Sequence, residues 1–230
     1  MAALVASHAR INATAPQIQV AFVECNPHSL EHYVREMVRE FDVTVVPLLL
    51  GDLVDPARRA ELAGVDCMVS TFFHLSEVRR TLRSVGLGTE LFAIAVRPHP
   101  GVLERLEHLP RGSTVGVAYV SEDDLAVERL RRMTDSLEHA GLRSIQFRPF
   151  LLQGEPDVAL FEGLDALVVR PENVAAARRV LPSGLAVIEF INELDAASRE
   201  FLREVIQDLR ARRSAVRPST AAARAESRRR

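Results

Sequence analysis

Apolar runs that alternate with amphipathic stretches cover the chain from residue 17 to residue 212. Within each run the apolar residues are nearly continuous, which is typical of strands buried on both faces of a parallel sheet. A half-exposed sheet would instead show apolar and polar residues in strict alternation. The pattern therefore predicts strands at 18–23, 42–48, 65–71, 90–96, 113–120, 143–150, 165–170 and 185–191.

Helix start and stop signals stand between these strands. Asn26 and Pro27 supply a capping residue and a first-turn proline, and residues 121–124 place a serine and three acidic residues at a helix start. Gly141 is typical of a helix end. Strands that alternate with helices predict an α/β fold of right-handed βαβ units. The predicted helices lie at 28–40, 74–84, 99–107, 121–140, 155–163, 171–181 and 195–212.

The strands can form one sheet, a closed barrel or two smaller sheets. A barrel needs about 250 residues and a full helix after every strand, and residues 51–64 leave room only for a short helix. We therefore expect a two-lobed α/β fold of mainly parallel sheets flanked by helices. Lobe 1 is predicted at 17–89 plus 192–212 and lobe 2 at 90–191, with disorder at 1–16 and 213–230.

Composition narrows the class of protein. No apolar run reaches the ~18 residues of a bilayer span, and the N-terminus lacks the pattern of a signal peptide. The two cysteines form no disulfide framework. We expect a cytoplasmic protein without a membrane partner. All 29 basic residues are arginine, which excludes the phosphate-binding lysine of a P-loop, a lysine Schiff base and the Ser–Lys dyad.

The charge is unevenly distributed along the chain. Residues 210–230 hold eight arginines and one glutamate, while the whole chain has a net charge of −2, so residues 1–209 are acidic. An acidic body does not attract a nucleic-acid backbone. A basic run of this kind is a weak signal for nucleic acid. We interpret the tail as a solubilising terminus in preference to a binding site.

Polar residues follow the first predicted strand. Glu24, Asn26 and Ser29 stand where this strand leads into a helix, whose free N–H groups suit a polar ligand. We predict that all three bind a ligand. The alternative, that Asn26 or Ser29 only caps the helix, stays open.

The third predicted strand ends in Thr71-Phe72-Phe73-His74. An imidazole and two aromatic rings at a strand end favour a ligand site, with Thr71 and His74 as binding residues. The alternative is that the phenylalanines fill an interface between the lobes and that His74 caps the next helix.

In the second lobe, Ser121, Arg170 and Glu189 end or follow predicted strands. We expect them to complete the ligand site, because small molecules bind at the carboxyl ends of parallel strands. A structural ion pair of Arg170 with Glu172 or Glu189 is the alternative.

Two further patterns are weaker. Residues 28–32 match H-x-x-E-H, but His28 lies in the first helical turn and the fold pattern is not that of a protease, so we expect no metal there. Cys25 ends the first strand and Cys67 begins the third, which places the two about 15–20 Å apart. Cys25 alone could act as a nucleophile, but the sequence shows no base beside it. We expect no cofactor.

Four segments together resemble a known family. They are VECN at 23–26, TFFHLSEVR at 71–79, LPRGSTVGV at 109–117, and DAAS with FLR within 195–203. The combination resembles the C-terminal effector-binding domain of GntR-type bacterial transcription regulators. The resemblance covers about residues 18–212. It implies a two-lobed fold like that of type 2 periplasmic-binding proteins, which closes on a small effector.

Those regulators carry an N-terminal winged helix-turn-helix of about 70 residues, and here sixteen residues precede the first predicted lobe. We therefore expect DNA contact only through a missing or separate domain. The sequence predicts a sensor that binds a small polar metabolite without chemistry and allows a homodimer. The alternatives are a cofactor-independent racemase, isomerase or decarboxylase acting through Cys25, and an interaction scaffold without a ligand.

Overall fold

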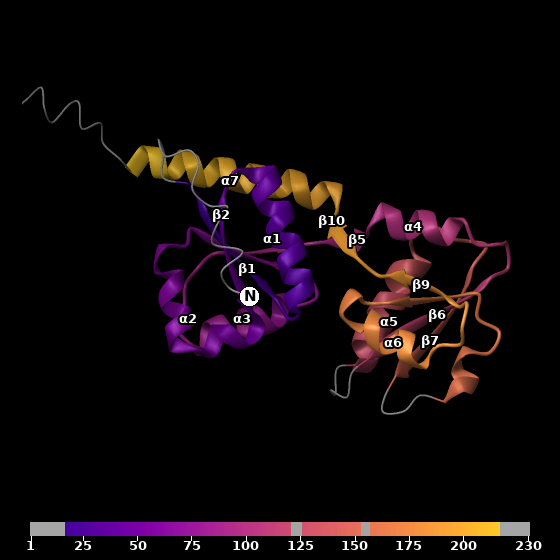
Figure 1. Ribbon diagram of the computed structural model, residues 1–230. Helices are drawn as coiled ribbons and strands as arrows, with labels where there is room; N and C mark the ends of the chain where they lie inside the picture. Colours follow the sequence, from indigo (N-terminus) through magenta and orange to yellow (C-terminus); the bar gives the residue numbers. More distant parts are fainter. Residues whose placement is uncertain (1–16, 121–125, 153–156, 217–230) are drawn as a thin grey trace, which may run out of the picture. The chain divides into compact units, whose positions relative to one another are not determined.

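The computed structural model describes residues 17–120, 126–152 and 157–216 (Figure 1). The chain divides into two compact units. Unit 1 contains the residues up to Ala95 and those from Leu194 onward, and unit 2 contains Val96–Glu193. The predicted disorder of residues 1–16 and of the tail beyond Val216 lies outside the described residues, as does the predicted helix start at 121–125.

Unit 1 is built on a four-stranded parallel sheet in the order β2-β1-β3-β4. β1 and β3 take the centre of the sheet and are its most buried strands. Pro47, which cannot donate to a strand ladder, lies in the edge strand β2. The strands are β1 (Gln19–Glu24), β2 (Thr44–Leu49), β3 (Cys67–Thr71) and β4 (Leu91–Ile94).

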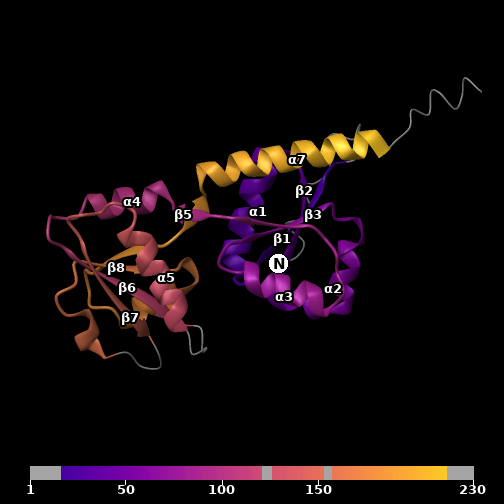
Figure 2. The ribbon, with the colours of Figure 1, turned by 180° about the vertical axis from the view of Figure 1, so that it is seen from behind.

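The helices of unit 1 follow the predicted pattern. Besides two short 3-10 segments at Leu50–Val54 and Glu61–Gly64, they are α1 (Pro27–Phe41), α2 (Pro56–Ala60), α3 (Leu75–Ser84) and α7 (Ala196–Val216). Figure 2 shows α7 crossing over one end of α1.

Unit 2 repeats the sheet order of unit 1, with four parallel strands in the order β7-β6-β8-β9. Its edge strand β7 again holds the proline, Pro149. The strands are β6 (Thr114–Val120), β7 (Gln146–Leu152), β8 (Ala166–Val169) and β9 (Ala186–Glu189). The helices are α4 (Pro100–Glu107), α5 (Ala126–Glu138) and α6 (Val174–Val180). Short 3-10 segments lie at Val158–Phe161 and Pro171–Asn173.

The strand predicted at 90–96 in lobe 2 is in fact two strands, and this prediction was wrong. β4 pairs with β3 and completes the sheet of unit 1. At Ala95 the backbone N–H leaves the ladder and donates to Ser198 Oγ at 2.8 Å. The chain then continues as β5 (Val96–Pro98), which pairs with β10 (Asn192–Leu194). A break of one residue within an apolar run leaves no trace in the hydrophobic pattern.

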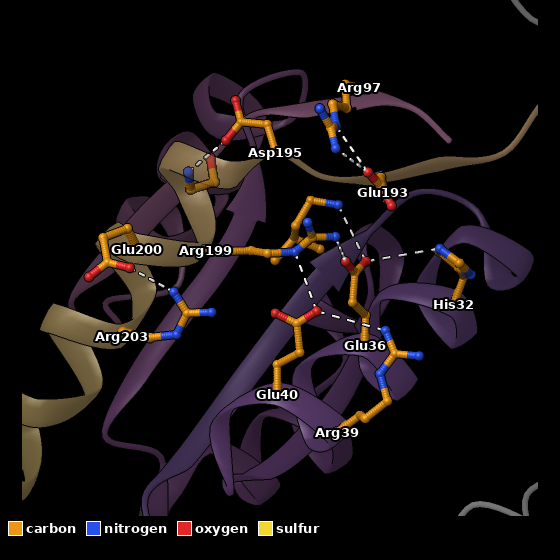
Figure 3. Close-up of polar contacts among 12 residues, drawn as sticks. His32, Glu36, Arg39, Glu40, Arg97, Glu193, Asp195, Arg199, Glu200 and Arg203 are labelled. Atoms are coloured by element: carbon orange, nitrogen blue, oxygen red, sulfur yellow. Dashed lines mark hydrogen bonds and ion pairs between the residues drawn. The ribbon is translucent and has the colours of Figure 1, made fainter. Parts of the chain in front are cut away.

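Helix α7 is fixed to unit 1 by polar contacts with α1 (Figure 3). The Arg199 guanidinium forms ion pairs with Glu36 and, at 3.3 Å, with Glu40. Glu36 is buried, and its second carboxylate oxygen accepts a hydrogen bond from the Leu194 backbone N–H at 3.3 Å. The carboxylate thereby holds the chain where it re-enters unit 1.

The same helix extends beyond its predicted end. Residues 213–216 were predicted to belong to a disordered tail, yet α7 continues to Val216. Arg213 forms an ion pair with Asp66 at 2.8 Å and donates to the backbone carbonyl of Gln17. These two contacts stabilise the last helical turns. No helix of the described residues has the length and apolar character that crossing a bilayer requires.

Two other predicted helices are shorter than expected. The described part of the stretch 155–163, residues 157–163, contains a single 3-10 turn, Val158–Phe161, and Gly163 after it has a φ of +73°. The stretch 171–181 begins as a 3-10 turn, Pro171–Asn173, before α6.

Candidate functional site

The candidate site lies at the carboxyl edge of the unit 1 sheet, where its two central strands end. Val23 of β1 pairs with Ser70 of β3. Glu24 and Thr71 each follow one of these partners, so they lie beside each other at the ends of neighbouring strands. Ligand sites of open α/β sheets lie at this edge.

Glu24 and His74 form an ion pair of 2.7 Å between Glu24 Oε1 and His74 Nε2. Both side chains are largely buried, with exposed fractions of 6% and 12%. The same oxygen of Glu24 accepts a hydrogen bond from the Cys25 backbone N–H at 2.8 Å. The carboxylate is thus held by two donors, which fixes its orientation.

The pKa values of the pair move apart. Burial by itself raises the pKa of Glu24, but the hydrogen bond and charge of His74 outweigh it and hold that pKa below its ordinary value. Burial lowers the pKa of His74, whereas hydrogen bonds to Cys25 and Glu24 and the charge of Glu24 raise it to about 9. At neutral pH the pair is therefore a carboxylate beside an imidazolium.

The Cys25 thiol belongs to the same cluster. One donor atom from each of Glu24, Cys25 and His74 lies within 4.8 Å of the others. Cys25 is partly exposed. The sequence shows no base beside Cys25, and it is the fold that brings an imidazole and a carboxylate close to this thiol. This set of groups is the one that nucleophilic thiol sites use.

Thr71 ends β3 beside Glu24, and the environment of its hydroxyl group is unusual. Its side chain is 1% exposed, and its Oγ1 has no hydrogen-bond partner among the residues that the structure describes. A buried hydroxyl without a partner costs roughly 1–3 kcal/mol. Its neighbour Ser70, also buried, avoids this cost by donating to the Val23 carbonyl at 2.9 Å.

The other residues of this edge were predicted either to bind a ligand or to have only a structural role. His74 occupies the N-cap position of α3, but its side chain makes no capping hydrogen bond and contacts Glu24 instead. Phe72 and Phe73 are exposed by 60% and 42%. Asn26 caps α1, since its Oδ1 accepts from the backbone N–H groups of His28 and Ser29. For Asn26 and Ser29 the structure thus adds the capping contact, and a ligand role stays a prediction.

The candidates of unit 2 occupy the matching edge of their own sheet. Val169 pairs with Glu189, so Arg170 and Glu189 end neighbouring strands. Arg170 forms an ion pair with Glu172 at 2.7 Å and lies over the Tyr119 ring at 5.9 Å. This is the structural pair that the sequence left open. Glu189 is exposed, and Ser121 lies outside the described residues.

The remaining motifs form no common site. His28 is exposed, and His32 Nε2 lies 3.9 Å from Glu36 Oε2. The thiol of Cys67 is buried, and Cys67 pairs with Val20, five residues before Cys25. Burial raises the pKa of Cys67 to about 12, with further contributions from Asp66 and Glu90. The two thiols do not act together.

A family model described as the YmtS Rossmann-like domain matches residues 127–213. The match runs from α5 into α7 and covers less than half of the chain. No curated protein and no solved structure gives a significant match. The fold is a mixed α/β fold of parallel sheets flanked by helices, to part of which this Rossmann-like family is similar.

Proposed function

We propose that this chain is the effector-sensing part of a bacterial transcription regulator of the GntR type, with a fold like that of type 2 periplasmic-binding proteins. It binds a small polar metabolite without altering it, and it contacts DNA only through a separate winged-helix domain. Such regulators act in the cytoplasm. The ligand contacts the carboxyl edge of the unit 1 sheet.

The observation that carries the proposal is the buried Thr71 hydroxyl without a partner beside the Glu24–His74 ion pair. Burying charged and polar groups costs free energy that a purely structural edge avoids with apolar residues. A ligand with a hydrogen-bonding group offsets the cost at Thr71. The exposed ring of Phe72 offers an apolar contact close by.

Thermal unfolding of the full chain with a panel of small metabolites tests this function. A ligand at about 100 times its Kd stabilises the protein by about 2.7 kcal/mol. This corresponds to roughly 10–20 °C in the melting temperature of a unit of about 100 residues. The ligand must be recovered unchanged. A panel that covers organic acids, amino acids and sugars and leaves the melting temperature unchanged contradicts the proposal.

Two variants separate ligand contact from structure. Thr71→Val removes a hydroxyl that has no partner within the described part of the chain. We therefore expect the affinity to fall roughly fivefold, which corresponds to about 1 kcal/mol, without loss of stability. Ser70→Ala is the matched control. It removes the hydrogen bond to Val23, so it lowers stability and leaves the affinity unchanged.

The second candidate function is covalent chemistry through Cys25, such as an isomerisation or decarboxylation. It is favoured by the position of the thiol within 4.8 Å of the His74 imidazole and the Glu24 carboxylate. Product formed from a panel substrate, and lost in Cys25→Ser, would establish the enzyme. Binding without product that survives Cys25→Ser supports the sensor.

A further inference from the structure

The carboxyl edge of unit 1 brings together three different kinds of donor atom. Glu24 offers a carboxylate oxygen, Cys25 a thiol sulfur and His74 an imidazole nitrogen, all within 4.8 Å of one another. Among residues 17–120, 126–152 and 157–216, this is the one group of at least three such side chains gathered so closely. Sulfur, nitrogen and oxygen donors together suit Zn²⁺ and similar divalent transition-metal ions, whereas Mg²⁺ and Ca²⁺ prefer oxygen donors alone.

The scaffold that carries these donors is rigid. Glu24 is the last residue of the central strand β1, Cys25 follows it, and His74 precedes α3. The backbone N–H of His74 donates to the Thr71 carbonyl at 3.0 Å, which closes the turn after β3. Three donors on neighbouring strand ends need little rearrangement to meet one ion. In a tetrahedral zinc site the nitrogen and oxygen ligands stand about 3.4 Å apart, so the pair at 2.7 Å opens slightly.

We propose that Glu24, Cys25 and His74 bind a zinc-class divalent cation and leave its fourth coordination position open. The ion takes the sulfur as a thiolate and the imidazole as a neutral ligand. The thiol proton and the proton between Glu24 and His74 therefore pass to the solvent. Three protein ligands with one open position are the pattern of zinc sites that bind a further molecule.

Ion binding does not depend on the effector. A second step does rest on the proposed function: an oxygen of the metabolite occupies the fourth position, which favours effectors with a carboxylate or hydroxyl group. The Thr71 hydroxyl lies beside Glu24 at the same edge and stays available to such a molecule.

The experiment titrates Co²⁺, a spectroscopic substitute for Zn²⁺, into the reduced, chelator-treated full chain. We expect a single site with a thiolate-to-cobalt charge-transfer band that Zn²⁺ displaces. The band disappears in Cys25→Ser, and the affinity falls by at least about 10–100-fold in Glu24→Gln. Cys67→Ser is the matched control and keeps the band. Absence of the band in the unaltered chain, or its persistence in Cys25→Ser, overturns the proposal.

A second measurement needs no variant. Zn²⁺ should protect Cys25 from iodoacetamide in the unaltered chain, as read by mass spectrometry of the Cys25 peptide, and unprotected alkylation at saturating Zn²⁺ overturns the metal site. Melting temperatures with the metabolite panel are then compared for zinc-loaded and chelator-treated protein. A shift in both forms without any cobalt band retains the sensor and rejects the metal. A cobalt band without any shift retains the metal and rejects the sensor.

Discussion

The two units use the same sheet order but differ at the edge where their strands end. In unit 1 the edge holds a buried ion pair, a thiol and a hydroxyl without a partner. In unit 2 the corresponding edge holds the Arg170–Glu172 pair, which is more exposed, and the exposed Glu189. The comparison teaches that the sheet fixes where a site can form, while the residues just after the strands decide whether it does.

The largest expected effect is that of Glu24→Gln. The substitution leaves His74 buried without its carboxylate, and removing one partner of a buried ion pair costs about 3–5 kcal/mol. We expect the loss in unit 1 only. Hydrogen exchange read by mass spectrometry, peptide by peptide, assigns the loss to a unit. An equal loss in peptides of unit 2 would contradict the separation of the units.

The second-largest expected effect is a pH dependence of stability that arises from the Glu24–His74 pair of unit 1. In metal-free protein the pKa of His74 is raised from 6.5 to about 9, so its contribution is complete below pH 6.5 and is lost as the pH rises towards 9. The pKa of Glu24 is lowered, so its contribution is present above about pH 4.5 and is lost as the pH falls further. Melting curves of the unaltered chain should therefore lose stability between pH 6.5 and 9, and Glu24→Gln should remove most of that slope.

A smaller effect is expected at the centre of the unit 2 sheet. A Cβ at Gly116 would stand 2.7 Å from Leu164 Cδ1 and 2.8 Å from Leu167 Cδ1. Gly116→Ala should therefore overpack this core by about 1–3 kcal/mol. Unit 1 has Ala21 at the same place in β1 and needs no glycine. Gly88→Ala, which meets no atom within 4 Å, is the control, and denaturant midpoints measure both.

The smallest effect is expected for Glu172→Gln. The Arg170–Glu172 pair is partly solvated, with exposed fractions of 16% and 24%, and such pairs contribute about 0–1 kcal/mol. Denaturant midpoints compared with those of Glu24→Gln test this directly. A loss as large as that of Glu24→Gln would mean that the unit 2 edge is also a built site.

Much of the fold follows from the apolar runs, because strands buried on both faces leave a strong signal. The short strand β10 leaves none, since Asn192 and Glu193 are polar. The site was predicted through Glu24, Thr71 and His74, which follow central strands. The contact of Cys25 with His74 was missed because it depends on β1 lying next to β3. That adjacency is a property of strand order, which the hydrophobic pattern does not contain.

Glu36 is a second residue whose role could not be predicted from the sequence. In the sequence it is one acidic residue among several on an amphipathic helix, yet its carboxylate is buried and binds both Arg199 and the Leu194 N–H. These partners lie more than 150 residues away. A residue whose role depends on so distant a partner cannot be recognised from its own neighbourhood.

Because unit 2 interrupts unit 1 in the sequence, the ribosome synthesises all of unit 2 before it completes unit 1. All of Val96–Glu193 is translated, and leaves the exit tunnel, ahead of α7. Unit 2 can therefore fold before α7, whose arginines contact α1, is available to unit 1. During that interval the nascent first half presents the apolar surface that Leu202 and Ile206 will later cover, which makes it a natural client for chaperones.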